Sequence, residues 1–111
     1  HQMVTDNYYA KELAYQEVID AKNRAKSITL SFKRGADGLD VLIQNGPEKL
    51  SNASVNLYRA GNSKLDVALN FDSISERLHI DSSYLVEGNY LFTLSYSFQD
   101  ESYLVEAPLI Y

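Results

Sequence analysis

The sequence predicts a mainly β protein: an immunoglobulin-like antiparallel β-sandwich of about seven strands, preceded by one N-terminal α-helix. Three observations predict this fold. Residues 6–26 carry the only convincing helical period, apolar residues alternate at every second position from residue 27 onward, and turn residues interrupt that alternation about every 8–12 positions. We therefore divide the chain into a helix over 1–26 and a sandwich over 27–111, which together form one folding unit.

The helix is predicted over "DNYYAKELAYQEVIDAKNRAK", where Thr5 or Asp6 can accept the first free N–H groups. No proline or glycine interrupts it. At 100° per residue, one apolar face holds Tyr8, Tyr15, Val18 and Ile19. A second apolar face, about 120° away, holds Tyr9 and Leu13.

Two apolar faces exceed what one docking surface needs, and two arrangements follow. Both faces can be covered by the domain itself, or one face can pack on the sandwich while the other meets a partner or the membrane surface. We assign the face with Tyr8, Tyr15, Val18 and Ile19 to structure. The candidates for partner contact are Tyr9, Leu13 and the flanking Gln16.

The first three strands are predicted at "SITLSF", "LDVLIQN" and "ASVNLYR", separated by the turn "GADG" and the loop "GPEKLSN". Side chains two apart share one side of a strand. The inward sets are Ile28, Leu30 and Phe32, then Leu39, Val41 and Ile43, then Ala53, Val55 and Leu57.

The remaining strands are predicted at "KLDVALNF", "RLHI", "NYLFTLSYSF" and "YLVEAPLIY". "QDES" reads as a hairpin turn between the last two. Pro108 cannot donate to a strand ladder, so the last strand should lie at a sheet edge or end there. Tyr90 follows Gly88 at the start of the longest strand. Immunoglobulin-like sandwiches place a corner tyrosine there, with its hydroxyl bonded to upstream backbone. The inward sets are Leu65, Val67, Leu69 and Phe71, then Tyr90, Phe92, Leu94, Tyr96 and Phe98, then Tyr103, Val105, Ala107 and Leu109.

The net charge of −5 disfavours nucleic acid as a partner. The charge is also divided: residues 1–34 carry +2 and residues 35–111 carry −7. This division is either ordinary solvated surface or an acidic face that meets a cation or a basic partner. The absence of cysteine excludes thiol catalysis and thiolate metal sites.

The sequence offers no pattern typical of an enzyme or a metal site. The only imidazoles are His1 and His79, and His79 is expected to face solvent from a strand. Imidazole and thioether ligands suit copper, but the inventory is His1, Met3 and His79. We therefore expect no catalytic residue, no bound cofactor and no metal ligand in this chain.

The opening stretch "DNYYAKELAYQEVIDAKNRA" resembles the start of the extracytoplasmic domain of FixH-family proteins. The resemblance rests on a Tyr-Tyr-x-Lys-x-Leu-x-Tyr core, and the strand pattern matches the family layout. That core is formed here by Tyr8, Tyr9, Lys11, Leu13 and Tyr15.

The resemblance implies a non-enzymatic, single-pass inner-membrane factor with this domain in the periplasm and a membrane helix upstream of His1. It implies a role in assembly of a cbb-type haem-copper cytochrome c oxidase, possible coupling to copper delivery, and oxidase subunits and a copper-exporting P-type ATPase as partners. Two alternatives stay open: a copper-handling periplasmic domain, and a generic immunoglobulin-like binding module of the cell envelope.

Overall fold

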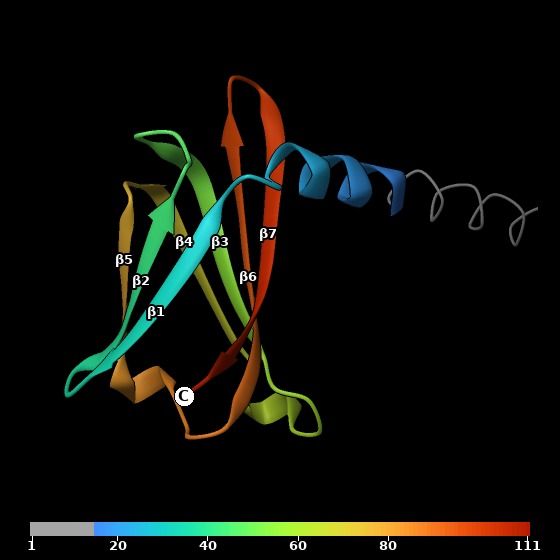
Figure 1. Cartoon of the computed structure of the whole chain (residues 1–111). Helices are drawn as coiled ribbons and strands as arrows, with labels where there is room; N and C mark the ends of the chain where they lie inside the picture. The colour runs from blue at the N-terminus through green and yellow to red at the C-terminus, as the bar shows by residue number, and fades with distance from the viewer. Residues whose placement is uncertain (1–14) are drawn as a thin grey trace, which may run out of the picture.

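The computed structural model describes residues 15–111, which form a helix followed by seven strands (Figure 1). The helix covers residues 15–24. Two short 3₁₀ turns, η1 and η2, lie between strands. In chain order the elements are β1 (Thr29–Gly35), β2 (Gly38–Gln44), β3 (Leu50–Tyr58), η1 (Ser63–Leu65), β4 (Val67–Ile74), β5 (Arg77–Asp81), η2 (Ser82–Tyr84), β6 (Asn89–Phe98) and β7 (Glu101–Ile110).

The strands form two antiparallel sheets that face each other, which confirms the predicted sandwich. One sheet has the order β1-β2-β5 and the other has the order β4-β3-β6-β7. In the constant-type immunoglobulin arrangement the fourth strand joins the sheet of the fifth. Here β4 pairs with β3 instead, with Val55 opposite Leu69. The domain is therefore a switched variant of the immunoglobulin-like sandwich.

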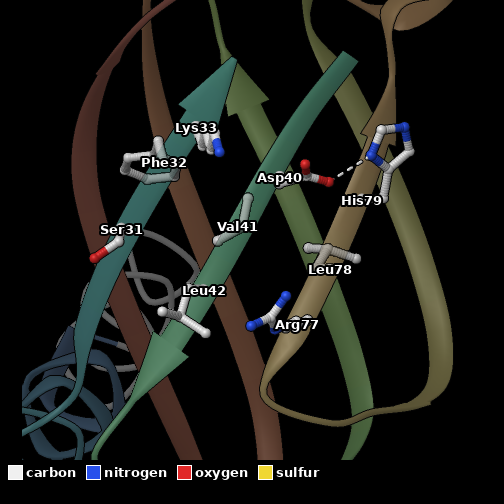
Figure 2. Close-up of a pocket in the computed structure, with 9 residues that line it drawn as sticks. All are labelled: Ser31, Phe32, Lys33, Asp40, Val41, Leu42, Arg77, Leu78 and His79. Atoms are coloured by element: carbon white, nitrogen blue, oxygen red, sulfur yellow. Dashed lines mark hydrogen bonds and ion pairs between the residues drawn. The ribbon is translucent and has the colours of Figure 1, made fainter. Parts of the chain in front are cut away.

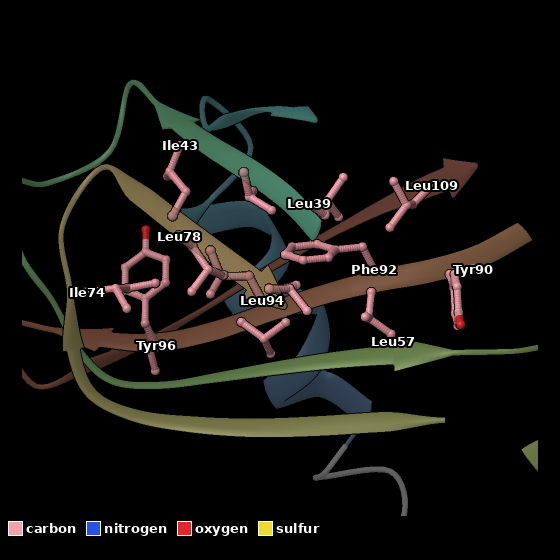
Figure 3. Packing of buried hydrophobic residues seen from close by; sticks show 14 of the residues in the cluster. Leu39, Ile43, Leu57, Ile74, Leu78, Tyr90, Phe92, Leu94, Tyr96 and Leu109 are labelled. Atoms are coloured by element: carbon pink, nitrogen blue, oxygen red, sulfur yellow. The ribbon is translucent and has the colours of Figure 1, made fainter. Parts of the chain in front are cut away.

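The core lies between the sheets and is built from the alternating apolar positions of every strand (Figure 3). Phe92 is fully buried at its centre and packs edge-to-face on Phe32, with ring centroids 5.1 Å apart. The most deeply buried side chains come from both sheets: Leu39, Val41, Ile80, Leu50, Val55, Leu57, Phe92 and Leu94.

Several strand boundaries differ from the prediction by one to three residues, and two of the differences have a visible structural cause. Leu65 lies in η1 and not in β4, because the Asn62 side chain accepts a hydrogen bond from the N–H of Lys64 at 3.2 Å and tightens the chain into a turn. β3 begins at Leu50, three residues earlier than expected. Asn52 there has φ of 49°, and the register of β3 with β6 shifts between Ser51 and Ser54. The bulge breaks the strict alternation on which the prediction relied.

The last strand lies at a sheet edge, as Pro108 indicated. β7 pairs only with β6, where Pro108 is opposite Leu91. The hairpin that joins them turns through Gln99 and Asp100, whose φ angles are 51° and 62°. Two consecutive positive φ angles are typical of the tight hairpin turn that matches the strand twist.

The C-terminal end of the helix is attached to the sandwich beside β7, and the rest of the described helix points away from the two sheets (Figure 1). Ala21 of the helix and Ala25, directly after it, are buried. Lys22 pairs with Glu106 of β7 at 2.5 Å. Arg24 pairs with Glu101 at 2.5 Å and donates to the backbone carbonyl of Ser102 at 2.8 Å. Within residues 15–111, no helix is both long and apolar enough to cross a bilayer.

Candidate functional site

The outer face of the three-stranded sheet carries a shallow hollow of about 630 Å³ (Figure 2). Two rows of outward side chains cross it. The cross-strand register places Lys33 of β1 opposite Asp40 of β2, and Asp40 opposite His79 of β5. The second row is Ser31, Leu42 and Arg77. The lining of the hollow thus combines charged side chains with the half-exposed apolar side chain of Leu42.

His79 and Asp40 form the one polar contact drawn within this hollow (Figure 2). The Nδ1 of His79 lies 2.7 Å from Oδ1 of Asp40, and the carboxylate accepts because it has no proton to donate. This hydrogen bond, with the negative charge of Asp40, raises the pKa of His79 above its ordinary value of 6.5. Both side chains are exposed, so His79 faces solvent as the sequence indicated.

The hollow has cations available for an anionic group. Among residues 15–111, neither Lys33 nor Arg77 has an ion-pair partner. Nucleophilic catalysis requires a hydroxyl or thiol bonded to a base. Among the described residues, no hydroxyl is hydrogen-bonded to His79, which pairs with Asp40. In the same part of the chain, no group of three or more His, Cys, Asp or Glu side chains is placed to hold a metal ion.

The helix exposes part of the apolar face that was expected to be structural. Tyr15 is 69% exposed and Val18 is 40% exposed, while Ile19 is half-buried. Tyr15 and Val18 are therefore largely open to solvent within residues 15–111, and the structural role of the whole face stays a prediction. The described helix meets the sandwich near its last turn, where Lys22 and Arg24 pair with glutamates of β7, and the helix extends past β7 (Figure 1).

The partner-contact candidates lie mostly outside the described residues. Tyr9 and Leu13, like Tyr8, fall in that part of the chain. Gln16 is exposed, and its Nε2 donates to Oδ1 of Asp20 at 3.1 Å, one helical turn away. Tyr15 and Val18 are three residues apart and share one exposed side of the helix, which makes them further candidates for contact.

The corner at the start of β6 has the predicted geometry. Tyr90 is buried, and its hydroxyl accepts the backbone N–H of Val86 at 3.0 Å. This is the upstream backbone contact expected of a corner tyrosine.

Sequence reasoning missed the partner of this corner, Arg59. Its guanidinium donates to the carbonyls of Val86 at 2.9 Å and Glu87 at 2.6 Å, and lies 4.9 Å from the Tyr90 ring centroid. A Cβ at Gly88 would overlap this guanidinium. No local motif marks Arg59, because its contacts come from a loop 27 and 28 residues further along the chain.

The charge division found in the sequence is partly balanced by ion pairs within the molecule. The basic side chains of Lys22 and Arg24 meet the acidic side chains of Glu106 and Glu101 on β7. The charge split thus supports docking of the helix as well as surface solvation. Exposed pairs of this kind each contribute about 0–1 kcal/mol, so they orient the helix more than they hold it.

These features define a class: an immunoglobulin-like sandwich domain led by a helix, with exposed apolar and charged surfaces available for binding. The particular family follows from comparison with known proteins. The chain belongs to the FixH family, whose family model matches residues 1–109. Searches of curated proteins and of solved structures gave no significant match. The FixH family is membrane-associated and is linked to assembly of cbb-type oxidase.

Proposed function

We propose that this chain is the extracytoplasmic domain of a membrane-anchored, non-enzymatic factor that assists assembly and maturation of a cbb-type haem-copper cytochrome c oxidase. The observation that carries the proposal is the FixH family match over residues 1–109. The sandwich fold is compatible with it, because such domains place their variation in exposed surfaces and loops.

The proposed location is the inner membrane, crossed once, with this domain in the periplasm. The described helix supports it by leaving the sandwich at one end, as a connector to an anchor would (Figure 1). Tyr15 and Val18 are exposed there, and tyrosine is favoured near the membrane–water interface. A topology reporter fused after Tyr111 of the full-length protein should give a periplasmic signal, and a cytoplasmic signal would exclude this location.

The proposed partners are other membrane proteins of the oxidase assembly machinery, namely oxidase subunits and the copper-exporting P-type ATPase. We place the contact on the helix, at Tyr9, Leu13 and Gln16 together with the exposed Tyr15 and Val18. Exposed aromatic and aliphatic side chains on a protruding element are suited to a partner's groove.

Any coupling to copper delivery is proposed to pass through the pump and not through a copper site in this chain. The imidazole and thioether inventory is small, and His79 is already bonded to Asp40. Titration of the purified chain with Cu(I) should give no stoichiometric binding tighter than about micromolar. A tight one-to-one site would favour the copper-handling alternative.

Gene deletion in the native host tests the function itself. Loss of the gene should lower assembled cbb-type oxidase in the membrane, while other terminal oxidases keep their levels. Complementation with the full-length gene should restore the oxidase. Normal oxidase levels in the deletion strain would overturn the proposal.

A further inference from the structure

The two central strands of the four-stranded sheet are free of charge. β3 and β6 have 9 and 10 residues, and none of them is Asp, Glu, Lys or Arg. Since 23% of the chain is charged, about four charged residues would be expected in such a length. The inward positions of these strands are apolar because they form the core, but the outward positions have no such constraint.

The outward side chains of these strands form a continuous uncharged face. Their cross-strand pairs are Tyr58 with Leu91, Asn56 with Thr93 and Ser54 with Ser95. We call these six residues the uncharged face. Tyr58 is 54% exposed and Leu91 is 39% exposed. Pro108 continues the apolar end of the face onto β7, where it is opposite Leu91.

The other sheet shows that this lack of charge is specific to one face. Its outward positions include Lys33, Asp40, Arg77 and His79. On the four-stranded sheet, by contrast, the charged side chains of the four strands all stand on the two edge strands, at Asp72 of β4 and at Glu101 and Glu106 of β7. Glu106 is neutralised by Lys22. Charge depletion at the centre, with tyrosine present and charge at the rim, is typical of protein–protein interfaces.

We propose that the uncharged face packs against the same face of a second copy of this chain, sheet against sheet. Each copy carries a net charge of −5, so two copies repel, and this repulsion is smallest where the surfaces that meet carry no charge themselves. The face also supplies its own anchors, because Tyr58 and Leu91 are exposed side chains of the kind that dominate interfaces. No basic patch is needed on the partner, which distinguishes a second copy from a charged partner.

The area of the whole outer surface of the four-stranded sheet sets the strength of the association, with the uncharged face at its centre and the edge strands β4 and β7 as its rim. Four strands about 4.8 Å apart and about eight residues long cover roughly 500 Å² per copy. Two copies would bury about 1,000 Å² in total, at the lower end of specific interfaces. The dimer is therefore weak, with a dissociation constant of about micromolar or above.

The orientation of the pair rests on the proposed function. Sheets that pack face to face keep their strands nearly aligned. A two-fold axis along the strands places both helices at the same end, where two anchors can enter one membrane. An axis perpendicular to the strands would place them at opposite ends.

Sedimentation velocity of the chain at increasing concentration tests the dimer. The wild type should pass from monomer to dimer, and Asn56→Glu should stay monomeric over the same range. Ser31→Glu is the matched control, because it adds the same charge at an exposed strand position of the other sheet. Tyr58→Ser should raise the dissociation constant at least tenfold, and Tyr84→Ser, from a tyrosine of similar exposure, should leave it unchanged.

The salt dependence gives a second readout. Because the copies repel, added salt should tighten the dimer by screening the −5 charges. A wild type that stays monomeric up to about millimolar concentration, equal behaviour of Asn56→Glu and Ser31→Glu, or a dimer that dissociates with salt would each overturn the proposal. Val18→Ser serves as a control for association through the helix, and loss of the dimer in this variant would also overturn it.

Distance measurement between two spin labels tests the orientation. The chain has no cysteine, so Lys64→Cys in η1 provides a single labelling site at the end of the sandwich opposite the helix (Figure 1). Helices at the same end predict a label separation shorter than the length of a ten-residue strand, about 34 Å. A longer separation in a proven dimer would overturn the orientation alone. Failure of the oxidase role would instead appear in the deletion strain, so the two results are separable.

Discussion

Tyr90 and Tyr96 lie on the same side of β6, and both side chains are buried. Their hydroxyl groups have opposite environments. Tyr90 accepts the N–H of Val86, while the hydroxyl of Tyr96 has no partner among the described residues. Burial, with a smaller effect from Tyr103, raises the pKa of Tyr96 to about 12. The two tyrosines therefore allow the contribution of a buried hydroxyl to the free energy of unfolding to be measured twice in one strand, once with a hydrogen-bond partner and once without.

Removing each hydroxyl should change stability with opposite sign. Tyr90→Phe leaves the part-buried N–H of Val86 without its acceptor and should lower the free energy of unfolding by about 1 kcal/mol. Tyr96→Phe removes an unpartnered polar atom, keeps the stack on Tyr103 and should raise that free energy by about 1 kcal/mol. Urea denaturation of the two variants checks both values. A loss of stability in Tyr96→Phe would show that its hydroxyl is bonded in solution.

His79 should titrate above 6.5, because Asp40 favours its protonated form. A group whose pKa is raised by folding adds stability below its unfolded pKa and loses that contribution as the pH rises through the folded pKa. Asp40→Asn should therefore cost more stability at about pH 6 than at about pH 8.5. NMR titration of the assigned His79 ring gives the pKa directly, and an equal pKa in wild type and Asp40→Asn would contradict the contact.

At the scale of elements, the helix and β7 form the junction on which the proposed function depends. Ala21 and Ala25 let the helix approach the sandwich closely, and Lys22 and Arg24 fix its direction through the glutamates of β7. The junction is small, since the buried side chains that residues 15–26 contribute to it are those of Ala21 and Ala25. The helix is therefore expected to undock without unfolding of the two sheets.

Ala25→Asp tests the junction by placing an unpaired charge at a buried position. Hydrogen exchange should show lost protection of the amides in residues 18–24, while the amides of β3 and β6 stay protected. Lys26→Asp provides a matched control, because Lys26 is exposed next to Ala25. Equal loss of protection in the helix and in β6 would mean that the helix and sandwich unfold as one unit.

The strands themselves could be predicted from the sequence, because each one buries every second side chain and is bounded by turn residues. The alternation of apolar residues does not determine which strands pair with one another. The pairing of β4 with β3 depends on contacts between whole strands, and the bulge at Asn52 shifts a register that a regular pattern assumes.

The functional surfaces were predictable only in part. The corner contact of Tyr90 followed from Gly88 and the strand start. Arg59, directly after β3, reaches the same corner from 27 residues earlier in the sequence, and no local motif marks it. The exposure of Tyr15 and Val18 depends on where the helix leaves the sandwich, which helical periodicity alone does not fix. The uncharged face was visible in the composition of β3 and β6 once their outward positions were known.

For the whole molecule, the fold positions three separate surfaces. The helix extends from one end, the charged hollow occupies the outer face of one sheet, and the uncharged face occupies the outer face of the other. This separation allows one copy to hold its own second copy and an assembly partner at once. Changes on one surface should therefore leave the others unaffected, since mutations at distant sites act independently.

The central claim is that this domain assists oxidase assembly through its exposed helix. The most direct test is the amount of assembled cbb-type oxidase in native-host membranes when the deletion strain carries the full-length gene with Tyr15→Ser and Val18→Ser. We predict a several-fold loss of oxidase with normal levels of the factor, and full oxidase with the control pair Tyr84→Ser and Val86→Ser, which are also exposed apolar residues. Full oxidase in the helix variant, or in the deletion strain itself, would contradict the claim.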